Sequence, residues 1–415
     1  MKWRRHIALP VVLVLLIGAY FSWRWYSFNV PTKEGVCRLR RVAFPLDRAG
    51  SLSVRFYRTT TDQPEAIKDA PAGLSHQARF FVIDLPQRKL AGCIDERNKA
   101  LIVYVDTNAN GLLSDEKSLQ RKRITIRAEG EKWKFWRFGP VPLKAGSARP
   151  DAIQRCFLTT QSPRYVDIHP IHSYAGKIRI GDNVHEVVLM DSDYDGQYRT
   201  VFSPDCVQGR WANCDSMAFD YDRDGRFTHI VFHSVEEVPL SRLLRVDGQY
   251  YTVHLSQDMR RLTLSKIEPE FGTVQFSIPD TQALLWSDAF SGYVTASDGT
   301  YSLPVGRYSA SRFRARVKVE QDDWEMTSSY ETGRLKDFEI KPGKTTRLDF
   351  GPPFTAKVDV SQQARQVSLG PRLYGSGGEI YRSNVQKNGK VVEAPSFSIV
   401  TEDGTVLQKG RFKYG

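Results

Sequence analysis

Several motifs of familiar enzyme classes are absent from this sequence. It contains no Gly-x-Ser-x-Gly, no phosphate-binding loop, no dinucleotide-binding fingerprint and no His-Glu-x-x-His. These absences argue against the best-known hydrolase, nucleotide-binding and zinc-protease sites. The five cysteines include no Cys-x-x-Cys pair. No Glu or Cys completes a zinc-ligand set at familiar spacing around His169, His172, His185, His229 and His233. A zinc ribbon, a thioredoxin-like site and a zinc centre are therefore disfavoured.

Long apolar runs are also scarce, and the clearest one lies at the N-terminus. A basic head at residues 2–6 precedes an apolar run at residues 7–21, which is the order of an export signal. Bulky Tyr20 and Phe21 stand where a cleavable signal carries small residues. We therefore expect an uncleaved, single-pass anchor in the cytoplasmic membrane, with the N-terminus inside and the bulk outside. The alternative is secretion after signal cleavage.

The charge balance is strongly basic, with a formal net charge of +12. A basic surface favours anionic partners. For an exported chain we expect an anionic envelope glycan or another envelope protein as partner, and no nucleic acid. A basic surface without a specific partner is the simpler alternative.

Glycine and proline are frequent, and the apolar runs between them are short, a pattern typical of strands and turns. We predict a mainly β fold behind an N-terminal anchor helix. The linker-like Gly139-Pro140-Val141-Pro142 and residues 146–150 indicate a boundary. The expected parts are a signal anchor at 1–26, β-rich units at 37–145 and 151–265, an immunoglobulin-like or transthyretin-like antiparallel β-sandwich at 266–352, and a C-terminal β-module at 354–415.

Three segments share the pattern D-x-[DN]-x-[DN]-G. Loop 1 is Asp106-Thr107-Asn108-Ala109-Asn110-Gly111, loop 2 is Asp191-Ser192-Asp193-Tyr194-Asp195-Gly196, and loop 3 is Asp220-Tyr221-Asp222-Arg223-Asp224-Gly225. Alternate short side chains turn oxygens inward, the glycine allows the bend, and the next backbone carbonyl adds a ligand. Those carbonyls belong to Leu112, Gln197 and Arg226. Closely spaced carboxylates repel one another unless a cation lies among them, so we expect calcium.

The loops depart from a helical EF-hand. Position 12 of such a hand carries a bidentate glutamate, but here it is Lys117, Phe202 or Val231. Each loop also follows an apolar strand, so these are EF-hand-like loops held between strands. The nearest acids that supply an outer ligand are Asp115 or Glu116 for loop 1, Asp205 for loop 2, and Glu236 or Glu237 for loop 3. We expect weak sites, with loop 3 mattering most. The alternative for each loop is a polar turn without metal.

The segment around loop 1 resembles one found in uncharacterised exported bacterial proteins. It consists of Leu101-Ile102-Val103-Tyr104-Val105, loop 1 and Leu112-Leu113-Ser114-Asp115-Glu116. In those proteins an apolar strand runs into Asp-Thr-Asn-x-Asn-Gly-Asp-Leu-x-Asp-Asp; this chain departs at Leu112. Ser302-Leu303-Pro304-Val305-Gly306-Arg307-Tyr308 and the terminal Tyr414-Gly415 are similar to their β-sandwich modules. The resemblance implies export, calcium loops and C-terminal sandwich modules, and it implies no particular activity.

Cysteine spacing favours one disulfide. Cys206 and Cys214 enclose seven residues, a loop that closes easily in an oxidising compartment. Together these features predict a calcium-stabilised, exported cell-envelope binding or structural protein without evident catalytic activity. The rival is a secreted hydrolase or carbohydrate-active enzyme whose Asp, Glu and His residues meet only in the fold.

Overall fold

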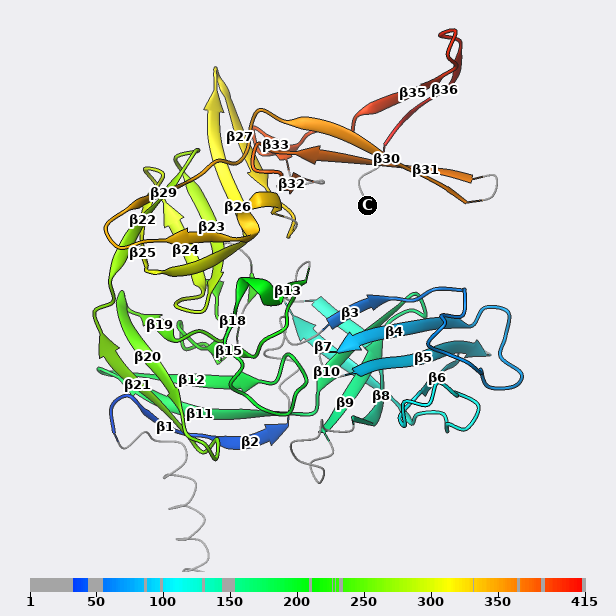
Figure 1. Cartoon of the computed structure of the whole chain (residues 1–415), viewed down its shortest axis with the longest axis horizontal. Helices are drawn as coiled ribbons and strands as arrows, with labels where there is room; N and C mark the ends of the chain where they lie inside the picture. The colour runs from blue at the N-terminus through cyan, green and yellow to red at the C-terminus, as the bar shows by residue number, and fades with distance from the viewer. Residues whose placement is uncertain are drawn as a thin grey trace, which may run out of the picture. The chain divides into compact units, whose positions relative to one another are not determined.

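The computed structural model describes residues 33–43, 55–85, 88–97, 100–128, 131–143, 154–208, 211–225, 227, 229–230, 234–330, 332–363, 366–381 and 385–412. Within these ranges the chain forms β-strands and two short 3-10 helices, with no α-helix, so the predicted mainly β fold is confirmed (Figure 1). The expected anchor at residues 1–26 lies outside the described residues. Among the described residues, no helix has the length and apolar character needed to cross a membrane.

The chain divides into two compact units, and each is built from several separate stretches of sequence. Unit 1 comprises residues 1–200, 214–228 and 251–267, and unit 2 comprises residues 201–213, 229–250 and 268–415. The change of unit near residue 267 lies close to the boundary expected at 266. Gly139–Pro142, expected to be a linker, instead belongs to a strand of unit 1, where the register shifts between Phe138 and Val141.

Two sheets of unit 1 enclose its first core. One sheet has the order β3-β10-β9-β8-β7, with strands Arg55–Arg58, Tyr165–Pro170, Gln154–Thr160, Glu131–Leu143 and Arg121–Ala128. The other has the order β4-β5-β6, with strands Arg79–Leu85, Arg88–Arg97 and Ala100–Val105. Alternate apolar residues of both sheets, such as Ile83, Val103 and Leu158, meet in one buried cluster.

A further sheet of unit 1 positions two of the three loops. It contains β15 (Ser216–Phe219), β12 (Asn183–Met190), β11 (His172–Ile180) and β2 (Arg40–Ala43) in that order. The end of β12, Val187–Met190, is buried on both faces, as its uninterrupted apolar sequence requires. The strands β1 (Val36–Arg38), β21 (Arg261–Ile267) and β20 (Gln249–Leu255) pair beside one another, and residues 251–255 of β20 belong to unit 1.

Unit 2 is built around a pair of sheets that share an aromatic core. One has the order β25-β22-β29, with strands Thr300–Pro304, Phe271–Phe276 and Thr345–Leu348. The other runs β24-β23-β26-β27-β33-β34, with strands Gly292–Ala296, Thr281–Ser287, Gly306–Val319, Asp322–Thr327, Val385–Lys387 and Lys390–Val391, and β28 (Phe338–Ile340) also pairs with β26. Phe313 and Phe350 stack at 4.6 Å in the core. One pair departs from the expected antiparallel pattern, because β22 and β29 are parallel.

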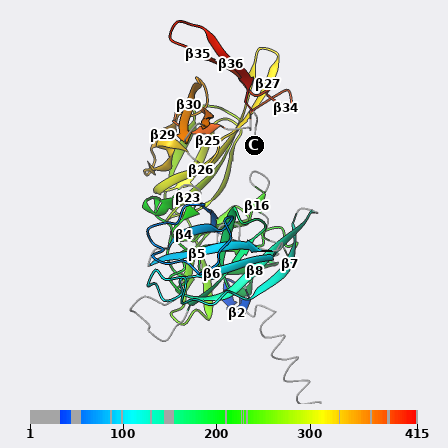
Figure 2. The same ribbon diagram turned by 90° about the vertical axis from the view of Figure 1, so that its right-hand side faces the viewer.

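Two hairpins extend from the sandwich of unit 2 (Figures 1 and 2). The first is β30 (Thr355–Gln363) with β31 (Gln366–Tyr374), extended by β32 (Ile380–Tyr381); the second is β35 (Ser396–Val400) with β36 (Val406–Arg411). The remaining elements are short: η1 (Pro204–Cys206), η2 (Gly333–Lys336), β13 (Val207–Gln208), β14 (Trp211–Ala212), β16 (His229–Ile230), β17 (Ser234–Val235), β18 (Glu237–Pro239) and β19 (Leu243–Val246).

The predicted disulfide between Cys206 and Cys214 is not formed. The pairing of β13 with β14 explains why, because Asn213, and not Cys214, lies opposite Cys206 and donates its N–H to the Cys206 carbonyl at 2.9 Å. Cys214 is therefore one residue beyond the position opposite Cys206. Elsewhere in unit 1, burial raises the pKa of the Cys37 and Cys93 thiols to about 12, which keeps them protonated.

Candidate metal centre

The three loops adopt the same turn. In each, the fourth residue has a left-handed backbone although it is not glycine, with φ of 61° at Ala109, 63° at Tyr194 and 66° at Arg223. The glycine two positions later has φ of 81°, 82° and 76° in loops 1, 2 and 3. Such conformations are unfavourable for residues with a Cβ. Their repetition at one position shows that the shared sequence pattern encodes one local geometry.

A common set of hydrogen bonds fixes this turn around the first aspartate. The Oδ2 atom of that residue accepts the N–H of the loop glycine, over 2.9 Å for Asp106, 3.0 Å for Asp191 and 3.2 Å for Asp220. The residues predicted to give carbonyl ligands close the turn with their N–H groups, Leu112 donating to Asn110 at 2.7 Å and Gln197 to Asp195 at 2.6 Å. Arg226 of loop 3 lies outside the described residues.

Loops 2 and 3 lie at the two ends of one antiparallel strand pair. Loop 2 begins directly after β12, and loop 3 begins directly after β15. In the register of this pair, Met190 lies opposite Ser216 and Val187 opposite Phe219. The two loops therefore end the same ladder on opposite sides. Loop 1 ends β6 elsewhere in unit 1.

A fourth carboxylate joins loop 2 from the neighbouring strand. Asp215 immediately precedes β15, one step beyond the pair of Met190 with Ser216, which places it opposite Asp191. Its side chain accepts the N–H of Ser192 at 3.3 Å and of Thr200 at 2.8 Å. Asp215 is not among the residues predicted from sequence, because strand pairing, and not sequence proximity, brings it to the loop. The available signal was an aspartate directly before an apolar strand.

The carboxylates of loop 2 are buried together. Asp191, Asp193 and Asp215 are 2%, 5% and 1% exposed, and the oxygens of Asp191, Asp193 and Asp195 lie within 4.8 Å of one another. Burial, and after it the neighbouring charge of Asp193, raises the pKa values of Asp191 and Asp215 well above the ordinary value for aspartate. The same two causes raise the pKa of Asp195 to about 6.

Within the described part of the chain, no lysine or arginine forms an ion pair with Asp193, Asp195 or Asp215. The donors gathered here are carboxylate oxygens, the ligands preferred by hard divalent cations. The arrangement is suited to holding such a cation and is costly as a set of bare anions.

Loop 3 gathers three carboxylates nearer the surface. The oxygens of Asp220, Asp222 and Asp224 also lie within 4.8 Å of one another, with Asp220 buried and the other two exposed. The Oδ1 atom of Asp220 is buried and has no hydrogen-bond partner. Burial raises the pKa of Asp220. A buried oxygen left without a partner calls for a compensating interaction, which a cation held in this loop would supply. Glu236 and Glu237, the expected outer ligands, are buried residues of unit 2.

Loop 1 is the least acidic of the three. Its nearby acid is Asp115, whose Oδ2 accepts the side-chain amides of Asn108 at 3.3 Å and Asn110 at 2.8 Å. Glu116 is instead bonded to Thr107, accepting its N–H at 2.6 Å and its hydroxyl at 2.8 Å. Of the two predicted acids, Asp115 faces the loop side chains and Glu116 holds the backbone.

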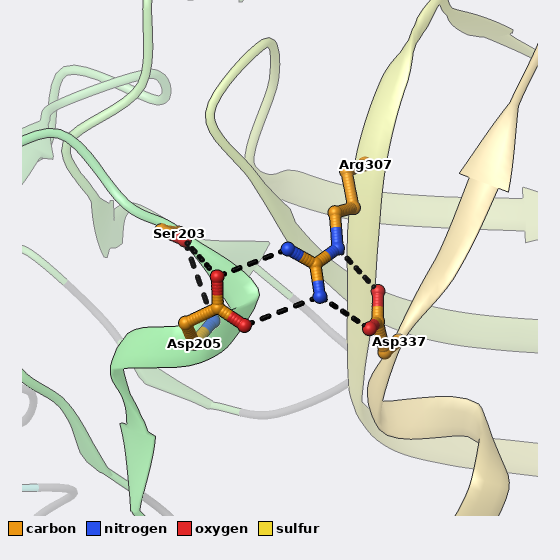
Figure 3. A network of polar contacts seen from close by, with 4 residues as sticks. All are labelled: Ser203, Asp205, Arg307 and Asp337. Carbon is orange, nitrogen blue, oxygen red and sulfur yellow. Dashed lines mark hydrogen bonds and ion pairs between the residues drawn. The ribbon is translucent and has the colours of Figure 1, made fainter.

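Asp205, the acid expected to complete loop 2, has a different role. In unit 2 the guanidinium of Arg307 forms two bonds to Asp205, at 3.0 and 3.2 Å, and also binds Asp337 (Figure 3). The Asp205 side chain also approaches the Ser203 hydroxyl at 3.5 Å. Its charge is therefore matched by arginine.

Comparisons with other proteins give no further guide to this site. No protein family, no curated protein and no solved structure matches the chain.

Proposed function

We propose that this chain is a calcium-stabilised protein of the cell envelope, with calcium ions held in loops 2 and 3 and a weaker site in loop 1. The observation that carries the proposal is Asp215. A side chain that directly precedes a separate strand joins the buried carboxylates of loop 2, and among the described residues no lysine or arginine forms an ion pair with Asp193, Asp195 or Asp215. The orphaned Oδ1 atom of Asp220 gives independent support from loop 3.

Calcium suits these loops better than magnesium. Calcium accepts roughly six to eight oxygens in irregular geometry, whereas magnesium demands a near-ideal octahedron and retains its waters. Loop 2 offers three carboxylates whose oxygens lie within 4.8 Å of one another, with Asp215 beside them, around a turn that is already formed. Since the loops lack the glutamate at position 12, we place their affinity in the range of extracellular modules, with dissociation constants of about 10⁻⁴–10⁻³ M.

The ions would serve the fold. A cation in loop 2 bridges the end of β12 to the start of β15, and a cation in loop 3 fixes the chain where it leaves β15. A ligand that binds only the folded state stabilises it by mass action, by about 2.7 kcal/mol per site at a hundredfold excess over the dissociation constant. The proposed task of calcium is therefore to hold this strand pair together outside the cytoplasm.

The test is thermal unfolding of the full chain in calcium, in magnesium and in chelator. We expect calcium to raise the melting temperature most, and Asp215→Asn to reduce this rise. Asp182→Asn is the matched control, because Asp182 is an exposed acid in the turn before β12 and should leave the rise unchanged. Identical melting in calcium and chelator, together with a metal-dependent hydrolytic activity, would favour the rival enzyme hypothesis.

The basic hairpin β7–β8 supports an anionic envelope glycan as partner. Residues 121–138 contain seven Lys or Arg and two Glu, a local net charge of +5 (7 − 2). The guanidinium groups of Arg121 and Arg123 lie 5.3 and 5.8 Å from the Trp136 ring centroid, which combines positive charge with a stacking surface. Replacing both arginines with alanine should weaken binding to an acidic polysaccharide in low salt. Arg260→Ala, a similarly exposed basic site in unit 1, should not.

A further inference from the structure

The hairpin β30–β31 has one apolar face and one polar face. The apolar face consists of Ala356, Val358 and Val360 on β30 with Val367, Leu369 and Pro371 on β31. Its three valines are strongly exposed, with exposed fractions of 49% for Val358, 66% for Val360 and 56% for Val367. The opposite face carries Lys357 and Asp359. Large apolar side chains on a projecting hairpin point to a missing partner.

The free edge of this hairpin is β30. In the described sheet the order is β30-β31-β32, so β30 has a neighbour on one side only. Gln363 pairs with Gln366 across a two-residue connection, a position that exchanges both hydrogen bonds within a hairpin. Counting back by twos, residues 357, 359 and 361 bond towards β31. The N–H and C=O groups of Ala356, Val358 and Val360 therefore face outward.

The charges on this edge are self-complementary. If two copies of β30 pair antiparallel about a twofold axis at Val358, Lys357 of each copy lies opposite Asp359 of the other. These become non-hydrogen-bonded pairs, in which side chains approach most closely, with Cα atoms about 4.5 Å apart. Val358 meets its own copy, and Ala356 meets Val360. Within one chain, Lys357 lies over the Tyr374 ring at 5.2 Å and Asp359 pairs with Arg372, which keeps both charges on the polar face.

Other registers close to this one are unfavourable for pairing of β30 with its copy. An axis at Lys357 or at Asp359 places like charges directly opposite each other, and a shift by a single residue sets apolar side chains against charged ones. The second hairpin offers a contrast, because Lys409 and Arg411 lie two residues apart on β36. Pairing of β36 with its copy about Gly410 would set like charges together, the usual protection of an exposed edge. On β30, the residue two positions after Lys357 is the oppositely charged Asp359, so pairing with a copy is favoured and not opposed.

We propose that β30 pairs antiparallel with β30 of a second copy of this chain, about a twofold axis at Val358. Such an interface is isologous, so it closes as a dimer and does not propagate into fibres. It joins the two hairpins into one continuous sheet, satisfies the outward backbone groups of β30 and packs Val360 of each copy beside Ala356 of the other.

Cysteine cross-linking of the full chain, carried out in detergent, tests the register. Val358→Cys should give a reducible dimer of twice 47.3 kDa, since the two cysteines meet at the axis. Val360→Cys alone should show only the background of the parent chain, but should cross-link when mixed with Ala356→Cys. Equal cross-linking of V358C and V360C, or none above background for V358C, would overturn the proposal.

Charge exchange provides the matched control with the same readout. In the V358C background, Lys357→Asp alone and Asp359→Lys alone should each lose the cross-link by creating like-charge pairs. Mixing the two variants should restore it, because every pair across the axis is then attractive. The double exchange K357D/D359K in one chain should also restore it. Cross-linking that is indifferent to these charges would contradict the register.

Discussion

Two acidic sites, one in each unit, are stabilised in opposite ways. In unit 2, Glu325 is held by Arg314 and Arg316 over 3.0 and 2.9 Å; although burial opposes it, these bonds keep the pKa of Glu325 below its ordinary value. In unit 1, burial and mutual repulsion raise the pKa of Asp191 and Asp215. At Glu325 arginine offsets the negative charge, whereas among the described residues no lysine or arginine forms an ion pair with Asp193, Asp195 or Asp215 of unit 1. Under the proposed function, the loop 2 site depends on an external cation and the Glu325 site does not.

The largest effect should come from Asp215→Asn, and its sign should depend on calcium. With calcium, the loss of one carboxylate ligand should weaken binding about ten- to a hundredfold, or about 1.4–2.8 kcal/mol. With chelator, the same change should raise the melting temperature, because one buried negative charge has been removed. Thermal unfolding under both conditions measures this. A loss of stability under both conditions would mean that Asp215 is a structural hydrogen-bonding residue only.

Next in size is the ranking of the three loops. Replacing the first aspartate with asparagine, at Asp191, Asp220 or Asp106, should reduce the calcium-dependent rise in melting temperature in that order. Loop 2 has the most buried carboxylates, loop 3 has two exposed ones, and loop 1 relies on amides. This order revises the expectation from sequence that loop 3 matters most. Scanning calorimetry of each variant with and without calcium measures this rise. An equal reduction in all three variants would show that burial of the carboxylates does not determine the ranking.

A smaller, calcium-independent effect is expected in unit 2. Glu325→Gln leaves Arg314 and Arg316 without their shared anion and should destabilise unit 2 by about 1 kcal/mol, the scale of a charged hydrogen bond at a partly exposed site. Urea unfolding in calcium and in chelator should give the same loss. A loss of stability that appears only in chelator would show that the stability of unit 2 also depends on calcium, contrary to the contrast drawn between the two sites.

The smallest effect concerns pH. Burial raises the pKa of Glu379, which accepts the Gly351 N–H at 2.6 Å and the Tyr381 hydroxyl at 2.9 Å. An acid with a raised folded pKa contributes stability that is complete below its unfolded pKa of 4.5 and is lost as pH rises through the folded value. The parent should therefore be less stable at pH 7 than at pH 4.5 by this contribution, and Glu379→Gln should lose less stability over the same step. Urea unfolding at the two pH values measures the loss of stability for the parent and for the variant. Equal losses in both would contradict the role given to Glu379.

Local sequence was sufficient to predict the three loops and the β class. The D-x-[DN]-x-[DN]-G pattern encodes its own turn, with the same backbone angles each time, and short alternating segments encode strands. What depended on strand register was not predictable. Asp215 reaches loop 2 only through the β12–β15 pairing, Cys206 lies opposite Asn213, and the Gly139–Pro142 segment forms an irregular part of β8. Each of these outcomes is decided by a partner strand that lies outside the motif.

Hydrogen exchange of the full chain, followed by mass spectrometry with and without calcium, tests the central claim most directly. Removal of calcium should speed exchange of backbone amides in β12 and β15, while amides in β23 and β26 of unit 2 should keep their protection. That result would place the cation dependence in the strand pair that carries loops 2 and 3. Unchanged exchange in β12 and β15, or an equal loss of protection in both units, would contradict it.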